Sequence, residues 1–236
     1  MQTRVGLFSL LLVSSMMILA AGKVLFREEF GPGWETHWTK SSWNAEQQGA
    51  FVSTKGKWYG DEDMAFAIQA TGDSKFFELS TKFPEPINTG KNPLVLQYSV
   101  KFEQVIDCGG GYIKAVVPDF DPATFGGKTP VLIMFGPDIC GSENRIHLLL
   151  DKNGTGYLWK KKPAAPNDKL THIYTVALYP NQSYAVYLDA IMQENGTLSE
   201  DWDMSIPKTI PDPNDKKPDV LILLYFLVEL GRKNVH

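Results

Sequence analysis

Short apolar segments separated by turn-forming residues make up most of this chain. Residues 94–102 and 172–179 are rich in β-branched and aromatic side chains, and apolar and polar positions alternate in the second half of 94–102. Residues 146–150 and 183–189 have the same character. Composition and alternation of this kind predict β-strands. Polar turn signals lie between them, such as Asp-Lys-Asn-Gly at 151–154, so we expect strands joined by tight turns.

The number of short strands predicts an all-β fold. Beyond the N-terminal segment, no stretch shows helical periodicity with capping residues. Many short strands with regular turns are typical of two packed antiparallel sheets, so we predict a β-sandwich or jelly roll. One sheet face of such a fold is often open and concave, and we expect a saccharide to lie there.

The N-terminus has the pattern of a secretory signal peptide. Arg4 precedes an apolar run from Val5 to Ala21, and small residues end it. A retained membrane anchor is the alternative, but the unbroken apolar part is short and no second long apolar segment follows. We therefore predict a signal peptide at 1–22, and the remaining chain is long enough for one large domain.

The composition changes after Trp202. Residues 205–219 contain four prolines and alternating charges, which is too little apolar surface to build a core. We therefore predict a globular domain at 23–204, an extended proline-rich arm beginning at 205–219 and an apolar tail at 220–236. The apolar stretch of the tail is too short to span a bilayer as a helix, and Glu229 interrupts it, so no membrane span is expected.

Charge and glycosylation signals favour a secreted binding protein. The net charge is −4 and no basic block occurs, so nothing supports a nucleic-acid partner. Three Asn-x-Ser/Thr acceptors lie in polar, turn-like contexts, where an attached glycan would be solvated. They are Asn153, Asn181 and Asn195.

Cys108 and Cys140 are the two cysteines of the chain. In a secreted protein an even number favours a disulfide. In the chain-entropy model, closing a loop of this length stabilises the fold by roughly 3 to 4 kcal/mol. Two free buried thiols are the alternative; metal ligation has less support, because no CxxC or histidine cluster accompanies the cysteines.

A run of three glycines follows Cys108 and precedes Tyr112 and Lys114. Glycines allow close backbone approach, and the two later residues would lie on the same face of a strand. A phenol ring can pack on the C–H face of a sugar while an ammonium donates to hydroxyls. A simple bulge or turn is the alternative reading of the glycines.

The second cysteine follows Ile-Met-Phe-Gly-Pro-Asp-Ile at 133–139. We expect Gly136-Pro137 to form a turn that aims Asp138, whose carboxylate can accept two hydrogen bonds from neighbouring hydroxyls. Met134 would supply adaptable apolar contact. The alternative is that Asp138 only stabilises its own turn.

Residues 107–114 and 133–141 resemble the two signature stretches of the calreticulin and calnexin family, in the same order and separation. The calreticulin branch fits better, because no membrane span is predicted. The resemblance covers roughly residues 23–219. Shorter matches lie at 26–30, 56–61, 102–104, 170–174 and 201–203.

The resemblance implies a legume-lectin-like β-sandwich that acts as a lectin-type chaperone rather than an enzyme. Such a protein binds monoglucosylated high-mannose glycans on unfolded glycoproteins in the lumen of the endoplasmic reticulum. Tyr112, Lys114 and Asp138 would be glucose ligands, with Met134 as a packing contact.

The resemblance also implies a calcium ion and a protein partner. The ion would be bound by Glu29 and the backbone carbonyls of Met64 and Phe66, since oxygen ligands suit calcium. The proline-rich arm would recruit a thiol-disulfide isomerase.

Two departures from the family pattern support a second hypothesis. Val131 replaces an aromatic residue that contacts sugar in the family, and the sequence leaves the family pattern inside the first repeat of the arm. We therefore expect an incomplete sandwich with exposed sheet edges, and a truncated member without sugar binding is the alternative. No Lys-Asp-Glu-Leu signal is present, so secretion is an alternative to retention.

A jelly-roll glycoside hydrolase is the least favoured function. Such an enzyme needs two carboxylates across the scissile bond. No tight acidic pair lies on an alternating strand, so the sequence favours a binding module.

Overall fold

The computed structural model describes residues 22–63, 65–83, 87 and 89–204, together with the backbone of residues 225–230. Residues 1–21 of the predicted signal peptide, the predicted arm at 205–219 and Met64 lie outside the described residues. The described residues cover most of the predicted globular domain at 23–204 and one strand of the predicted tail.

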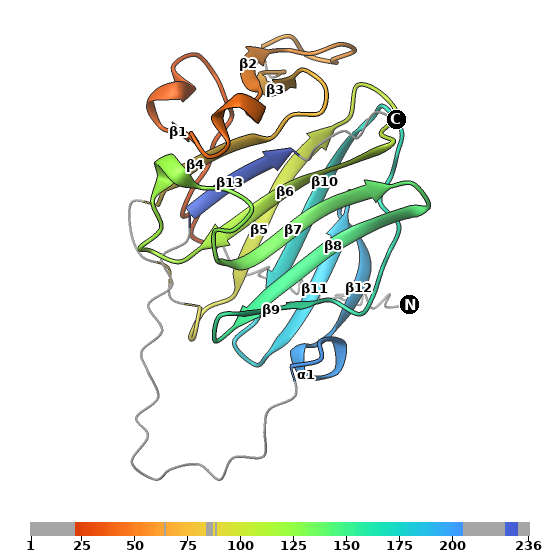
Figure 1. Ribbon diagram of the computed structural model, residues 1–236. Helices are drawn as coiled ribbons and strands as arrows, with labels where there is room; N and C mark the ends of the chain where they lie inside the picture. Colours follow the sequence, from red (N-terminus) through yellow and green to blue (C-terminus); the bar gives the residue numbers. More distant parts are fainter. Residues whose placement is uncertain (1–21, 64, 84–86, 88, 205–224, 231–236) are drawn as a thin grey trace, which may run out of the picture.

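Two antiparallel sheets form the body of the molecule (Figure 1). The larger has the order β1-β4-β13-β6-β7-β8-β9, and the smaller has the order β12-β11-β10-β5. The larger sheet consists of β1 (Thr39–Lys40), β4 (Phe77–Lys82), β13 (Tyr225–Leu230), β6 (Cys108–Val116), β7 (Val131–Cys140), β8 (Glu143–Lys152) and β9 (Thr155–Leu158). The smaller consists of β12 (Ile191–Thr197), β11 (Ser183–Leu188), β10 (Thr171–Leu178) and β5 (Leu94–Lys101).

The remaining elements are short. A separate hairpin of β2 (Ala50–Thr54) and β3 (Ala67–Thr71) lies at one end of the larger sheet (Figure 1). The helical elements are α1 (Leu198–Asp201) and 3-10 turns at Trp34–Thr36, Ala45–Gln47 and Pro122–Thr124. The prediction of an all-β antiparallel sandwich is confirmed, and the four predicted strand segments fall within β5, β8, β10 and β11 or end one residue beyond them.

The main core lies between the two sheets. Alternate residues of β7, including Ile133 and Phe135, point to this core and meet Tyr174 and Val176 of β10. Burying each such side chain stabilises the fold by about 1.5 to 3 kcal/mol. The opposite face of the larger sheet therefore carries the other residues of each strand, and it is the face available to a ligand.

A second apolar cluster supports the N-terminal segment. Trp34 and Trp38 pack with Phe51 of β2 and with Phe77 and Leu79 of β4. These contacts attach the hairpin end of the molecule to β4, far along the sheet from β9.

The strand β13 lies in the middle of the larger sheet, between β4 and β6 (Figure 1). Its register pairs Tyr225 with Lys82 and Leu230 with Phe77 on one side, and Leu227 with Lys114 on the other. From the sequence we expected an incomplete sandwich with exposed sheet edges. At this position the structure differs, because six residues of the tail pair with β4 and four of these also pair with β6.

Over the ranges that the structure describes, no helix is long and apolar enough to cross a membrane.

Candidate carbohydrate-binding site

The predicted sugar ligands lie on two neighbouring strands of the larger sheet. The register pairs Lys114 of β6 with Met134 of β7, and Asp138 follows farther along β7. Tyr112 lies two positions before Lys114, so both side chains are on the same sheet face. Ile113, between them, is buried in the core. The candidate site is therefore on the face that points away from the core.

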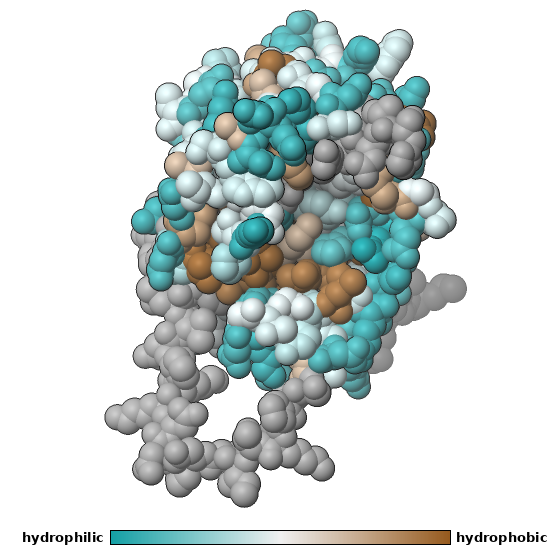
Figure 2. All heavy atoms as spheres, in the orientation of Figure 1, coloured by the Kyte–Doolittle hydropathy of each residue, from teal (hydrophilic) through white to brown (hydrophobic). Residues whose placement is uncertain are grey.

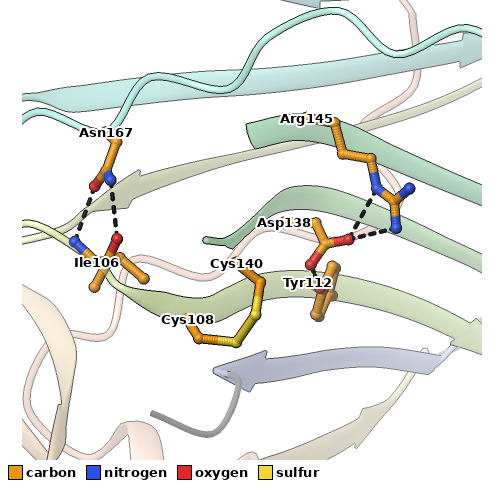
Figure 3. The surroundings of a disulfide bond; sticks show 7 residues. All are labelled: Ile106, Cys108, Tyr112, Asp138, Cys140, Arg145 and Asn167. Carbon is orange, nitrogen blue, oxygen red and sulfur yellow. Dashed lines mark hydrogen bonds and ion pairs between the residues drawn. A yellow bond between two sulfur atoms is a disulfide. The ribbon is translucent and has the colours of Figure 1, made fainter. Parts of the chain in front are cut away.

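The predicted disulfide between Cys108 and Cys140 is confirmed. The two cysteines are paired in register, at the first residue of β6 and the last residue of β7. Figure 3 shows the bridge beside Tyr112 and Asp138. The bond therefore fixes the two strands to each other at the end where these two ligands lie.

The predicted turn at Gly136-Pro137 is wrong, because both residues lie inside β7. The pairing with β6 is interrupted there instead, since proline has no N–H to donate and Gly136 has a φ of 150°. The hydroxyl of Tyr98, from the opposite sheet, reaches this interruption. It lies 2.7 Å from the carbonyl oxygen of Gly111 and 3.0 Å from that of Phe135. A residue of the core thus satisfies the backbone that the proline leaves unpaired.

Asp138 is the centre of a hydrogen-bonded group (Figure 3). The Tyr112 hydroxyl donates to its Oδ1 at 2.7 Å, and Arg145 Nε donates to its Oδ2 at 2.9 Å. Arg145 Nη2 lies 2.8 Å from the same Oδ2. Burial, with the hydrogen bond to Asp138, raises the pKa of Tyr112 well above its ordinary value, so the phenol stays protonated and donates. A sugar hydroxyl that binds Asp138 must share or replace one of these donors.

Sequence reasoning missed Arg145 and His147 of β8. Arg145 is in register with Asp138, and His147 is in register with Gly136. Both residues alternate with the core residues of β8, beginning with Ile146. That alternation was the available signal, but it places them beside Asp138 only once the register between β7 and β8 is known.

His147 is a neutral, half-buried group of the site. Its ring lies 5.5 Å from the Tyr112 ring in an edge arrangement, and its Nδ1 is 3.8 Å from Asp138 Oδ2. Neither ring nitrogen has a hydrogen-bond partner among the described residues. Burial lowers the pKa of His147 to about 4, although Asp138 acts in the opposite direction. The imidazole can therefore donate or accept toward a ligand hydroxyl.

Lys114 lies deep in the same face. It is 5% exposed, and its Nζ is 5.4 Å from the centre of the Phe125 ring. Burial lowers the pKa of Lys114 to about 8, and the charge of Glu78 opposes this shift. The ammonium is still mostly protonated at neutral pH, so it can donate to a ligand that reaches it.

Apolar side chains complete the face. Met134 is partly buried and lies in register with Leu149 of β8, while Val131 packs with Val116 and Phe125. Figure 2 shows an apolar band over the region of β7 and β8, with hydrophilic residues on both sides. Such a mixed surface suits a sugar ring, which has apolar C–H faces and polar edges.

The predicted calcium ligands lie at the hairpin end of the molecule. Glu29 and Phe66 line one groove of about 1320 Å³, and Met64 is outside the described residues. The Glu29 carboxylate accepts from Arg27 Nη2 at 2.5 Å. Carboxylate oxygens suit calcium, so the residues of this groove fit the ion. Further carboxylates that line it belong to Glu28, Asp61, Asp63, Asp73 and Glu103.

The described side chains do not by themselves form a metal-binding cluster. Among the residues that the structure describes, no three His, Cys, Asp or Glu side chains are grouped so that they could hold a metal. Two of the three expected calcium ligands are backbone carbonyls, which are not side chains, so the calcium site remains a prediction.

All three glycosylation candidates are exposed. Asn153 is in the turn between β8 and β9, Asn181 is in the turn between β10 and β11, and Asn195 lies on the edge strand β12. Each position is accessible to a glycan, and modification remains a prediction.

Comparison with known proteins identifies relatives that belong to one family. The family model "Calreticulin family" matches residues 26–220. The chain is 46% identical over 208 residues to calreticulin of Euglena gracilis, covering 88% of this chain and 51% of that protein. It is 46% identical over 218 residues to calreticulin of Chlamydomonas reinhardtii, covering 88% and 50%. The chain thus spans about half the length of these curated relatives.

A solved structure has the same fold. The T. cruzi calreticulin globular domain superposes with a TM-score of 0.78 at 38% sequence identity. The match covers 89% of this chain and 83% of that domain. The likeness therefore extends over most of the chain.

Proposed function

This chain belongs to the calreticulin family, and on that premise we propose that it binds the terminal glucose of monoglucosylated high-mannose glycans. The observation that carries the proposal is the pair Tyr112 and Asp138. Their side chains meet at 2.7 Å on one sheet face, beside the disulfide that joins their strands. A phenol ring and a carboxylate on one surface offer both kinds of contact that a pyranose needs.

Each residue of the proposed site has a distinct task. Asp138 accepts from sugar hydroxyls and Lys114 donates to them, while the Tyr112 hydroxyl, whose proton is donated to Asp138, accepts from them. Arg145 holds the Asp138 carboxylate in position through its two contacts. Met134 packs against the C–H face of the sugar. The chain's role is to bind and orient, so we propose a lectin and not a hydrolase.

Calcium is the proposed cofactor. Glu29 and the backbone carbonyls of Met64 and Phe66 would hold the ion. When bound, it supplies a positive charge that joins the N-terminal segment to the loop after β2. Since ligand binding stabilises the folded state by mass action, calcium is expected to raise the melting temperature.

The wider role that we propose is that of a chaperone for unfolded glycoproteins in the lumen of the endoplasmic reticulum. The predicted signal peptide and disulfide support entry into an oxidising compartment. A thiol-disulfide isomerase is the proposed partner of the arm, and secretion is the alternative fate.

A second candidate function is glycan-independent binding of unfolded chains. Val131 favours it, because this residue packs into the small cluster with Val116 and Phe125 and offers no hydroxyl or ring to a sugar. In that case the calreticulin-like fold would be retained without its glucose affinity.

Calorimetric titration with a glucose-capped mannose oligosaccharide tests the proposal, with calcium and with a chelator. Tyr112→Phe keeps the ring and removes the hydroxyl, so we expect a loss of about 1 to 3 kcal/mol in binding free energy. Binding by Val131→Tyr alone would support the second candidate. Release of reducing sugar by the wild-type chain would contradict a purely binding function.

A further inference from the structure

The larger sheet contains a gap one strand wide between β4 and β6, and β13 fills it. β13 pairs with β4 through six residues and with β6 through four. No direct pairing joins β4 to β6. Because β13 follows α1 by more than twenty residues of sequence, no tight turn couples it to either neighbour. The gap is thus a site that receives a strand from a separate segment.

The two strands that flank this gap, β4 and β6, present apolar residues on one sheet face and polar residues on the other. Toward the core, the flanking residues are Leu79 of β4 and Ile113 of β6, which are 1% and 3% exposed. On the opposite face lie Glu78, Ser80 and Lys114, all at most 5% exposed. A strand in the gap therefore meets an apolar wall on one face and a polar wall on the other.

Two polar atoms of this wall have no partner among the described residues. They are Oε1 of Glu78 and the hydroxyl oxygen of Ser80. The other carboxylate oxygen of Glu78 accepts from Gln48 Nε2 at 2.7 Å. A buried polar atom without a partner costs about 1 to 3 kcal/mol. A donor side chain from an incoming strand would remove that cost.

The described residues of β13 pair with only part of β6. β6 has nine residues, and β13 pairs with four of them, Gly111 to Lys114. The register sets Glu229 opposite Glu78 and opposite Tyr112. By the same register Ala115 and Val116 lie opposite Phe226 and Tyr225 of β13 without pairing to them, and a strand that pairs at these positions would gain about 0.5 to 1.5 kcal/mol for each added backbone hydrogen bond.

We propose that the gap between β4 and β6 is a polypeptide-binding site, which takes an extended segment of another chain antiparallel to both strands. The segment is apolar at alternate positions, facing Leu79 and Ile113, and carries a donor such as lysine or asparagine opposite Glu78. β13 is the resident competitor for this site. Recognition by strand addition draws affinity from backbone pairing and specificity from alternate side chains.

Full-length protein and a fluorescent peptide as long as β6 test the proposal. The peptide alternates valine with threonine and has one lysine at the position opposite Glu78. Val228→Pro removes a backbone donor from β13 and weakens the resident strand, so we expect it to lower the peptide dissociation constant at least tenfold. Val228→Ala keeps the N–H and is the matched control, which should change the constant less than threefold.

Two further arms identify the mode of binding. The same peptide with alternate amides N-methylated keeps its side chains but loses backbone donors, and it should bind at least tenfold more weakly. Replacing the lysine of the peptide by norleucine should weaken binding to the wild-type chain but not to Glu78→Gln.

Hydrogen exchange on the wild-type chain provides a test that does not depend on the folding of any variant. Added peptide should increase exchange at 225–230, while amides of β4 and β6 stay protected. The proposal is overturned if the peptide leaves this pattern unchanged, if the N-methylated peptide binds equally, or if concentrated protein exchanges β13 between two copies and excludes the peptide.

Discussion

Replacing Gly136 by alanine is expected to separate two strands of the candidate site. Gly136 has a φ of 150°, and an added Cβ would overlap both the Tyr98 hydroxyl and the backbone carbonyl oxygen of Gly111. The Tyr98 side chain or the backbone of β6 must therefore move. Either movement disturbs the hydroxyl that now satisfies the interrupted pairing.

Three contributions to the free energy of unfolding add in the same direction. Backbone strain at this φ costs about 1 to 3 kcal/mol, overpacking costs about 1 to 3 kcal/mol, and a buried carbonyl without a partner costs about 1 to 3 kcal/mol. We therefore expect Gly136→Ala to lower the free energy of unfolding by about 3 kcal/mol or more, which is a large part of the stability of a typical domain.

Gly141→Ala is the matched control. Gly141 also has a positive φ, 60°, but nothing lies within 4 Å of the added Cβ. This variant therefore carries the backbone strain alone, about 1 to 2 kcal/mol.

Urea unfolding followed by tryptophan fluorescence, without reductant, measures both variants against the wild-type chain. Equal losses for the two variants would refute the reasoning, because the crowding at Gly136 would then contribute nothing. Tyr98→Phe should show part of the loss in unfolding free energy that Gly136→Ala shows. If Tyr98→Phe loses no stability, the Tyr98 hydroxyl does not have the role assigned to it.

Three other predictions concern the disulfide and two histidines. Reduction of the bond between Cys108 and Cys140 should lower the free energy of unfolding by roughly 3 to 4 kcal/mol, measured by urea unfolding with and without dithiothreitol. The folded pKa of His147 is about 4, below the usual 6.5. The contribution of His147 to stability is therefore present above pH 6.5 and is lost as the pH falls toward 4. Proton NMR should show a ring that titrates near 4, and His147→Gln should flatten the dependence of the unfolding free energy on pH in that range. For His172, burial lowers the pKa, but hydrogen bonds to Asp189 and Asp168 outweigh it and leave the pKa raised, so its contribution is present below pH 6.5 and is lost as the pH rises through the folded pKa; a ring that titrates below 6.5 would contradict this.

The sequence carried enough information to predict the strands and one face of the site. Alternation along β6 placed Tyr112 and Lys114 together, and the cysteine count indicated the bond that holds β6 against β7. Both signals are local or depend on residue type alone. They therefore remain visible without knowledge of the fold.

Other features depend on contacts between distant segments. The position of Arg145 beside Asp138 follows from the register of β7 and β8, which the sequence pattern does not specify. The sequence Gly136-Pro137 is typical of a turn, but pairing of β7 with β8 on one side and the Tyr98 hydroxyl on the other keep it in a strand. Tertiary contacts here override a local preference.

The strand in the apolar tail is another feature that the sequence pattern does not predict. Residues 225–230 do not alternate clearly between apolar and polar positions, and a strand buried in a sheet cannot be recognised by alternation. Their partners, β4 and β6, lie more than a hundred residues earlier in the chain.

Because β13 lies between β4 and β6, the larger sheet can be completed only after β13 has been synthesised. A ribosome makes β4 and β6 long before β13, so the two parts of the larger sheet emerge and collapse with a gap between them. Contacts between residues so distant in sequence form slowly. During synthesis the nascent chain therefore exposes two unpaired strand edges, and chaperones that shield such edges are expected to associate with it until β13 has been made.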